Sequence, residues 1–198
     1  MKTVSRAVLL SGAALVNSLV SYAPASVKHP DVDRHASGPP TAHTGGFGEP
    51  TCQECHMGGE LNSPGGILGI VGMPSRYTPR TRYEIGVVLQ SEDMTLAGFQ
   101  GAVRFADGET RGTQAGNIEP LDARVAVVID QLTRIQYVQH AAAEDRIDPG
   151  GVVTWTFIWM APDARDAVML HVAANSANGD DSPLLDRVYT AEAFSAAR

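Results

Sequence analysis

The stretch that decides the fold is Val152-Val153-Thr154-Trp155-Thr156-Phe157-Ile158-Trp159-Met160. Large apolar side chains at 153, 155, 157 and 159 alternate with the residues between them, and this period of two is typical of a β-strand. Three of these side chains are aromatic and share one face, which we expect at the centre of a hydrophobic core. The stretch therefore predicts a buried strand in an all-β domain.

Six further short segments have strand-like sequences and are separated by turn signals such as Asp107-Gly108. With the stretch above, the expected strands are 83–89, 98–105, 124–130, 134–140, 152–160, 167–174 and 187–194. Short strands at this spacing predict an all-β fold, an immunoglobulin-like β-sandwich of about seven strands. Twenty glycines and twelve prolines also fit a fold with many turns.

The composition argues against several classes of protein. The chain has 198 residues, and its 22 acidic against 15 basic residues give a formal net charge of −7, which disfavours nucleic-acid binding. Two cysteines are too few for a disulfide-rich scaffold. Because the sequence has no nucleophile elbow, phosphate loop or zinc-protease helix, we expect the protein not to be an enzyme.

Residues 1–25 have the pattern of an export signal. Lys2 and Arg6 form a basic start, an apolar run follows from 7 to 20, and residues 23–25 are suited to cleavage. As a helix the run is about 21 Å long, short of the ~30 Å membrane core. The segment is expected to be cleaved or retained as an anchor, and the mature domain is not expected to span a membrane. This places the protein in the periplasm or on the extracytoplasmic face of the membrane.

Residues 26–50 are rich in Pro, Gly and His and poor in branched aliphatic residues. Such a segment cannot bury enough apolar surface to offset its chain entropy, so we expect an extended arm. His29, His35 and His43 lie in it, either as solvated side chains or with one of them binding a metal held elsewhere in the protein.

The chemistry is concentrated at Cys52-Gln53-Glu54-Cys55-His56. C-x-x-C-H is the attachment signature of a c-type haem. Cys52 and Cys55 would form the thioethers, and His56 would be the proximal iron ligand. We expect one covalent haem c, with residues 51–80 as the haem-attachment loop and residues 81–198 as the sandwich.

Three other interpretations of the motif compete with haem attachment. A thioredoxin-like redox pair needs a βαβ context, which the flanking Gly and Pro residues do not provide. A structural zinc site needs four ligands, and the sequence has no second cysteine pair. A plain disulfide across two residues would be strained and would leave His56 without a role.

The order of several short motifs resembles the bacterial Reeler-like family, which is related to the amino-terminal domain of reelin and is also called choice-of-anchor V. The matching segments are 48–58, 74–79, 98–100, 114–116, 137–140, 155–162, 174–180 and 186–189. The resemblance implies an extracytoplasmic immunoglobulin-like sandwich, often with the haem-type cysteine motif in front. Pro79-Arg80 departs from the expected Pro-Gly, and there is no carboxy-terminal sorting segment, so any anchor is expected at the amino end.

The second axial ligand of the iron would decide what the haem does. His140 ends an expected strand, small alanines follow it, and it matches a histidine of the Reeler-like motif, so it is the first candidate for the distal ligand. Met73 is the runner-up, followed by His171, Met160 and Met169, while an open site remains the alternative. Met57 is discounted because it neighbours His56.

Two functions remain open at this point. One is a mono-haem electron carrier, either free or docked to a redox partner protein or a membrane electron-transfer complex. The other is an adhesion or assembly module whose Cys-His motif is structural or vestigial.

In addition, Asn178-Gly179-Asp180-Asp181 could hold Ca²⁺ with Asp186 as a third oxygen donor, although a turn is the simpler interpretation.

Overall fold

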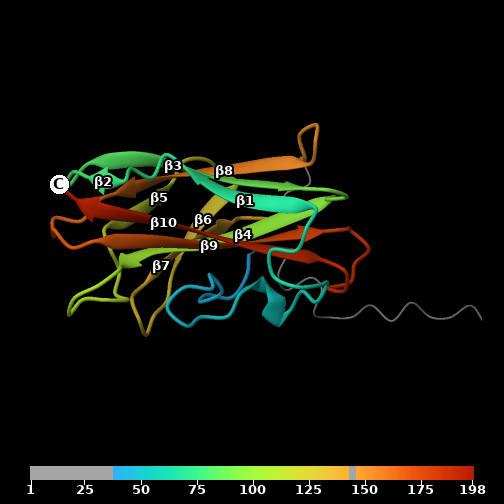
Figure 1. Cartoon of the computed structure of the whole chain (residues 1–198), viewed down its shortest axis with the longest axis horizontal. Coiled ribbons are helices and arrows are strands. Elements are labelled where there is room, and N and C mark those ends of the chain that lie inside the picture. The colour runs from blue at the N-terminus through green and yellow to red at the C-terminus, as the bar shows by residue number, and fades with distance from the viewer. Residues whose placement is uncertain (1–37, 143–145) are drawn as a thin grey trace, which may run out of the picture.

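The computed structural model describes residues 38–142 and 146–198, and the expected export signal and residues 26–37 of the arm lie outside them. Two β-sheets pack face to face, as Figure 1 shows. The strands are β1 (Gly66–Val71), β2 (Arg76–Tyr77), β3 (Arg82–Ser91), β4 (Leu96–Phe105), β5 (Asn117–Pro120), β6 (Val125–Ile129), β7 (Gln136–His140), β8 (Val152–Met160), β9 (Val168–Ala177) and β10 (Arg187–Ala197). The expected all-β sandwich is confirmed.

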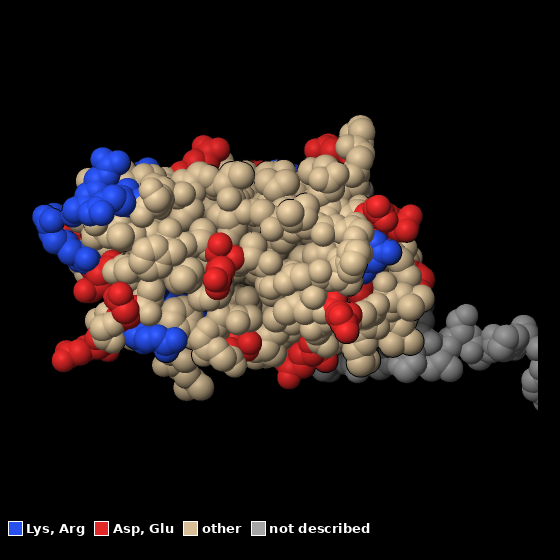
Figure 2. Space-filling view, in the orientation of Figure 1, with Lys and Arg blue, Asp and Glu red and all other residues tan. Residues whose placement is uncertain are grey.

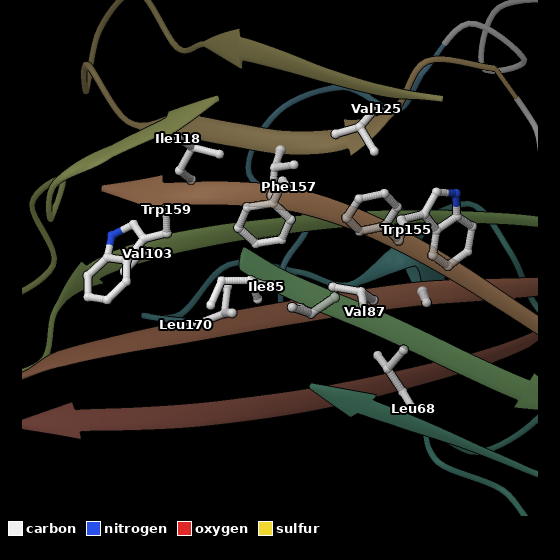
Figure 3. Packing of buried hydrophobic residues seen from close by; sticks show 14 of the residues in the cluster. Leu68, Ile85, Val87, Val103, Ile118, Val125, Trp155, Phe157, Trp159 and Leu170 are labelled. Carbon is white, nitrogen blue, oxygen red and sulfur yellow. The ribbon is translucent and has the colours of Figure 1, made fainter. Parts of the chain in front are cut away.

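The smaller sheet has four antiparallel strands in the order β1-β3-β8-β5. The alternation read from the sequence of β8 appears directly in its burial, because every second residue is buried and the others are partly exposed. Trp155, Phe157 and Trp159 are fully buried and point into the space between the sheets (Figure 3). The Trp155 ring stacks on Phe99 of the opposite sheet at 4.6 Å between ring centroids. The predicted core strand is therefore the central strand of the core.

The larger sheet has six strands in the order β2-β10-β9-β4-β7-β6. Its pairs are antiparallel except for the short β2, which runs parallel to the end of β10. One face supplies Phe99, Val103 and Leu170 to the core. The segment that precedes β1 lies on the other side of this sheet, away from β8 (Figure 1). That outer face of the six-stranded sheet holds the candidate site.

Three strands are additional to the seven expected ones. The four-residue β5 and the two-residue β2 are too short to show a period. β1 falls in the segment expected to be a haem-attachment loop. Its sequence does not have a strand-like pattern, because Gly66 and Gly69 interrupt the apolar residues and Ile67 is 65% exposed on the edge of the sheet. The sandwich therefore starts at Gly66, before the expected residue 81.

Basic side chains gather at one end of the face seen in Figure 2. Arg76 is held by the carbonyl of Ala197, and Arg165 by that of Arg198, both at the carboxyl end of β10. Arg82, at the start of β3, pairs with Met160 at the end of β8. The basic end is thus remote from residues 178–186, which precede β10.

In the part of the chain that the structure describes, no helix has the length and apolar character needed to cross a membrane.

Candidate functional site

The Cys-x-x-Cys-His segment folds as a 3₁₀ turn over Cys52–Glu54. Thr51 caps the turn by accepting a 3.2 Å hydrogen bond from the amide of Gln53. The carbonyl of Cys52 accepts from the amides of Cys55 at 3.2 Å and His56 at 2.9 Å. The turn therefore holds the two cysteines and the histidine together in a compact loop.

Both cysteines are free thiols, Cys55 being exposed and Cys52 partly exposed. Desolvation raises the pKa of the Cys52 thiol to about 12, so this thiol is protonated at neutral pH. A redox-active cysteine requires a low-pKa thiolate. The raised pKa of Cys52 therefore disfavours a thioredoxin-like redox pair.

His56 is oriented by a residue far away in the sequence. Its Nδ1 atom lies 2.6 Å from Oδ2 of Asp186, a residue that is 2% exposed at the start of β10. Nδ2 of Asn175 lies 3.1 Å from the same Nδ1 atom, so this ring nitrogen faces both a carboxylate oxygen and an amide nitrogen. About a third of the His56 side chain is exposed. Nδ1 of His56 is thus engaged by the protein, while part of the ring is open to solvent.

The motif is also fixed to the loop before β10 by the backbone. The amide of Met57 donates to the carbonyl of Pro183 at 2.8 Å, and the amide of Leu185 donates to the carbonyl of Met57 at 3.1 Å. Gly58 packs so closely on Asp186 that an added Cβ would lie 1.7 Å from the Asp186 carbonyl oxygen. A glycine is therefore required where the chain passes Asp186.

The structure brings His140 to the same end of the six-stranded sheet as His56. The His140 ring is buried against Gly98, where an added Cβ would lie 2.6 Å from its Cε1 atom. Gly98 pairs with Asn175 on the neighbouring strand, and Nδ2 of Asn175 lies 3.1 Å from Nδ1 of His56. Gly98 thus lies beside the His140 ring, and its strand partner Asn175 lies beside the His56 ring. Nδ1 of His140 lies 3.0 Å from the amide nitrogen and 3.1 Å from the carbonyl oxygen of Phe99.

Met73 does not approach His56. Met73 lies just before β2, which pairs with the last residues of β10. His56 contacts Asp186, which directly precedes the first residue of β10. Ten residues of strand separate these two places, about 33 Å. Met73 packs instead against the hydrophobic core, so the runner-up distal ligand is excluded by its distance. Of the other candidates, His171 is in contact with Phe47, at 5.1 Å between ring centroids.

Residues 41–50 dock on the outer face of the six-stranded sheet through a buried ion pair. Glu49 accepts hydrogen bonds from Arg104 and from the hydroxyl of Tyr137, the latter at 2.5 Å, while Thr44 donates to its second oxygen at 2.6 Å. The side chains of Arg104 and Glu49 are 5% and 11% exposed. This part of the expected arm therefore packs on its own sandwich. Desolvation lowers the pKa of Arg104, although the nearby Tyr137 opposes the shift.

One histidine of the arm reaches the motif. His43 places Nε2 2.6 Å from Oε2 of Glu54 and Nδ1 2.9 Å from the carbonyl of Thr41. Both of its ring nitrogens therefore face oxygen atoms of the protein. His29 and His35 lie outside the described residues.

The residues considered for Ca²⁺ form a hydrogen-bonded turn. Asp180 accepts from the amide of Ser182 at 2.9 Å and its own amide donates to the side chain of Asn178 at 3.1 Å. Asp186, the expected third donor, points instead to His56 and to the amide of Asn178. Within 38–142 and 146–198, no group of three or more His, Cys, Asp or Glu side chains is arranged to hold a metal ion.

Sequence reasoning missed Asp186 as the partner of His56 and Glu49 as the anchor of the arm. Asp186 lies 130 positions from His56, and Arg104 lies 55 positions from Glu49. Both contacts join the segment before β1 to distant parts of the six-stranded sheet, so the local sequence carries no signal for either contact.

No protein-family model matches the chain, and no curated protein matches it. Solved structures of similar fold include the Reelin-N domain of F-spondin, with 16% identity over 74% of this chain and 95% of that one and a TM-score of 0.48. The human F-spondin reeler domain has 17% identity, with 69% and 94% covered and a TM-score of 0.43. A cohesin module from a Clostridium perfringens family 33 glycoside hydrolase has 10% identity, with 69% and 98% covered and a TM-score of 0.49.

Proposed function

We propose that this chain is an exported mono-haem c-type cytochrome, built on a Reeler-like β-sandwich, that carries single electrons. The observation that carries the proposal is the 2.6 Å contact between Nδ1 of His56 and the buried carboxylate of Asp186, directly after two free thiols. Metal-binding histidines characteristically donate their second ring nitrogen to a carboxylate or carbonyl. His56 has this arrangement before any iron is considered.

The surroundings of the motif suit a flat and largely apolar group. Met57, Leu184 and Leu185 are 60%, 52% and 72% exposed, and the hydrogen bonds between residues 57 and 183–185 hold these side chains beside His56. Contiguous exposed apolar side chains mark a surface that binds something. Oδ1 of Asn175 is buried and has no hydrogen-bond partner among the described residues. These features support the haem proposal.

The roles of the residues follow from this placement. Cys52 and Cys55 would hold the group covalently, His56 would bind it through Nε2, and His140 would bind from the opposite side. Bound haem iron supplies one-electron exchange between its ferric and ferrous states. Nδ1 of His140 lies 3.1 Å from the carbonyl oxygen of Phe99. Two imidazoles would favour electron transfer over ligand binding, because neither axial position would be open.

The proposed location and partners follow from the amino-terminal sequence. Haem c is attached outside the cytoplasm, which agrees with the basic and apolar residues 1–25. Electrons would pass to a redox partner protein or to a membrane electron-transfer complex.

The test is haem staining after denaturing electrophoresis of the protein exported in a host that attaches haem c. The wild type should stain, and the double variant Cys52→Ala/Cys55→Ala should lose the stain while its circular dichroism remains that of a β-sandwich. The variant His56→Ala keeps both thiols and removes only the imidazole. It should therefore separate covalent attachment of the haem, which it retains, from ligation of the iron by residue 56, which it loses. A wild-type protein with no stain and with two titratable thiols would overturn the cytochrome proposal.

The second candidate is an adhesion or assembly module in which the motif is structural. It is favoured by one observation, the direct attachment of the motif to residues 183–186 by hydrogen bonds of the backbone and of His56. In that case His56→Ala should destabilise the haem-free protein, and haem staining should be negative in every variant.

A further inference from the structure

The carboxylate of Asp186 is held by more contacts than its hydrogen bond to His56. Its Oδ2 atom also lies 3.4 Å from Nδ2 of Asn175, and its Oδ1 atom accepts from the amide of Asn178 at 3.3 Å. Because both oxygens are engaged, the carboxylate cannot rotate away from the imidazole. Asn175 and Asn178 therefore fix Asp186, and Asp186 fixes His56.

Among residues 38–142 and 146–198, the ionisable side chain recorded in contact with the Asp186 carboxyl group is His56, whereas the adjacent Arg187 donates to the carbonyl of Glu92. In a site of low local dielectric, the contact between the Asp186 carboxyl group and Nδ1 of His56 is stronger than it would be in water.

We infer that Asp186 is the positioning residue of the site: it fixes the His56 tautomer with the proton on Nδ1 and increases electron donation from Nε2 to the bound metal. The inference rests on the proposed function and deepens it. A hydrogen-bonded carboxylate raises the basicity of a ligating histidine. Stronger donation stabilises the more positive, oxidised metal, so Asp186 lowers the reduction potential of the haem.

Two substitutions separate the orientation of His56 from the charge behind it. Asp186→Asn removes the charge but leaves an oxygen that can accept from Nδ1 of His56. Asp186→Ala removes both. The matched control is Asp180→Asn, which removes one carboxylate from the neighbouring exposed turn, where Asp180 contacts Asn178 and Ser182.

The first measurement is the midpoint potential of the haem-loaded protein by spectroelectrochemical titration. Asp186→Asn should shift it upward, and Asp180→Asn should shift it clearly less. A merely structural role for Asp186 would lower the stability of the variant without moving the potential. Equal potentials for Asp186→Asn and Asp180→Asn would overturn the electronic part of the inference.

The second measurement needs no haem. In the Cys52→Ala/Cys55→Ala background, long-range ¹H–¹⁵N correlation spectra report which nitrogen of His56 carries the proton. The Nδ1–H form should dominate in this parent and in Asp186→Asn, and it should lose its dominance in Asp186→Ala. If Asp186→Ala fails to fold, the parent spectrum alone decides, because a dominant Nε2–H form there overturns the positioning role. A negative haem stain with a dominant Nδ1–H form would refute the proposed function and leave the positioning intact.

Discussion

Replacing Glu49 by Gln should destabilise the protein strongly, because it leaves the Arg104 guanidinium buried without its carboxylate. The Arg104 side chain is 5% exposed, and its Nε already has no hydrogen-bond partner among the described residues. After the substitution it keeps the hydroxyl of Tyr137 at 2.7 Å and the Phe47 ring, whose centroid lies 5.3 Å away. Neither group carries a negative charge at neutral pH.

Breaking a buried ion pair by removing one partner costs about 3–5 kcal/mol. We expect the low end, about 3 kcal/mol, because residues 41–50 can open to water and so relieve Arg104. With a urea slope of about 2 kcal/mol per M, the unfolding midpoint should fall by about 1.5 M. The fluorescence of Trp155 and Trp159 reports this transition, since both are fully buried in the core.

The control is Glu119→Gln, which breaks the exposed pair between Arg82 and Glu119, where the side chains are 53% and 39% exposed. Such a pair contributes about 0–1 kcal/mol. Limited proteolysis should cut Glu49→Gln faster within residues 38–50 than it cuts the control. Equal unfolding midpoints and equal proteolysis for the two variants would refute the argument that Glu49 anchors the arm.

Three further substitutions test other parts of the outer face. Gly98→Ala should cost about 1–3 kcal/mol in urea unfolding, because its Cβ would lie 2.6 Å from Cε1 of His140, and unchanged stability would mean that the ring is not there. Tyr137→Phe should cost about 1–3 kcal/mol in the same assay, because Glu49 loses the hydroxyl that donates to it at 2.5 Å. Burial lowers the pKa of His171 below its ordinary 6.5, so the unfolded chain takes up this proton first and stability falls as the pH drops below 6.5 towards the folded-state pKa. His171→Gln should flatten this part of the stability-against-pH curve, and an unchanged slope would contradict the assignment.

The fold could be predicted wherever its signal was local. The alternation in β8 identified the core strand with its bounds, and the seven expected segments correspond to the seven strands β3, β4 and β6 to β10. β1 could not be found in this way, because an edge strand with exposed Ile67 and Val71 has no alternation between apolar and polar residues. The local sequence also does not determine which strands pair, so the division into sheets of four and six strands was not predictable.

In the candidate site, too, the residues of the local motif could be predicted, whereas the contact between distant residues could not. Cys52, Cys55 and His56 are contiguous enough to form a recognisable motif, and their assignment to haem stays a prediction. His140 was singled out by its position at a strand end, and the structure adds Gly98 as the residue that makes room for its ring. Asp186 was considered for Ca²⁺ because of its acidic neighbours. Its hydrogen bond to His56 depends on the register of β9 and β10, which no short stretch of sequence contains.

The separation of 130 positions between His56 and Asp186 has a consequence for the order of events in time. A chain made from its amino end presents Cys52, Cys55 and His56 long before Asp186 exists. Contacts between positions so far apart form late, because a long loop must close before they can be made. During that interval the thiols are accessible and the imidazole turns freely. In the proposed cytochrome, covalent attachment of the haem could therefore precede the orientation of His56 by Asp186, which is completed when β10 pairs with β9.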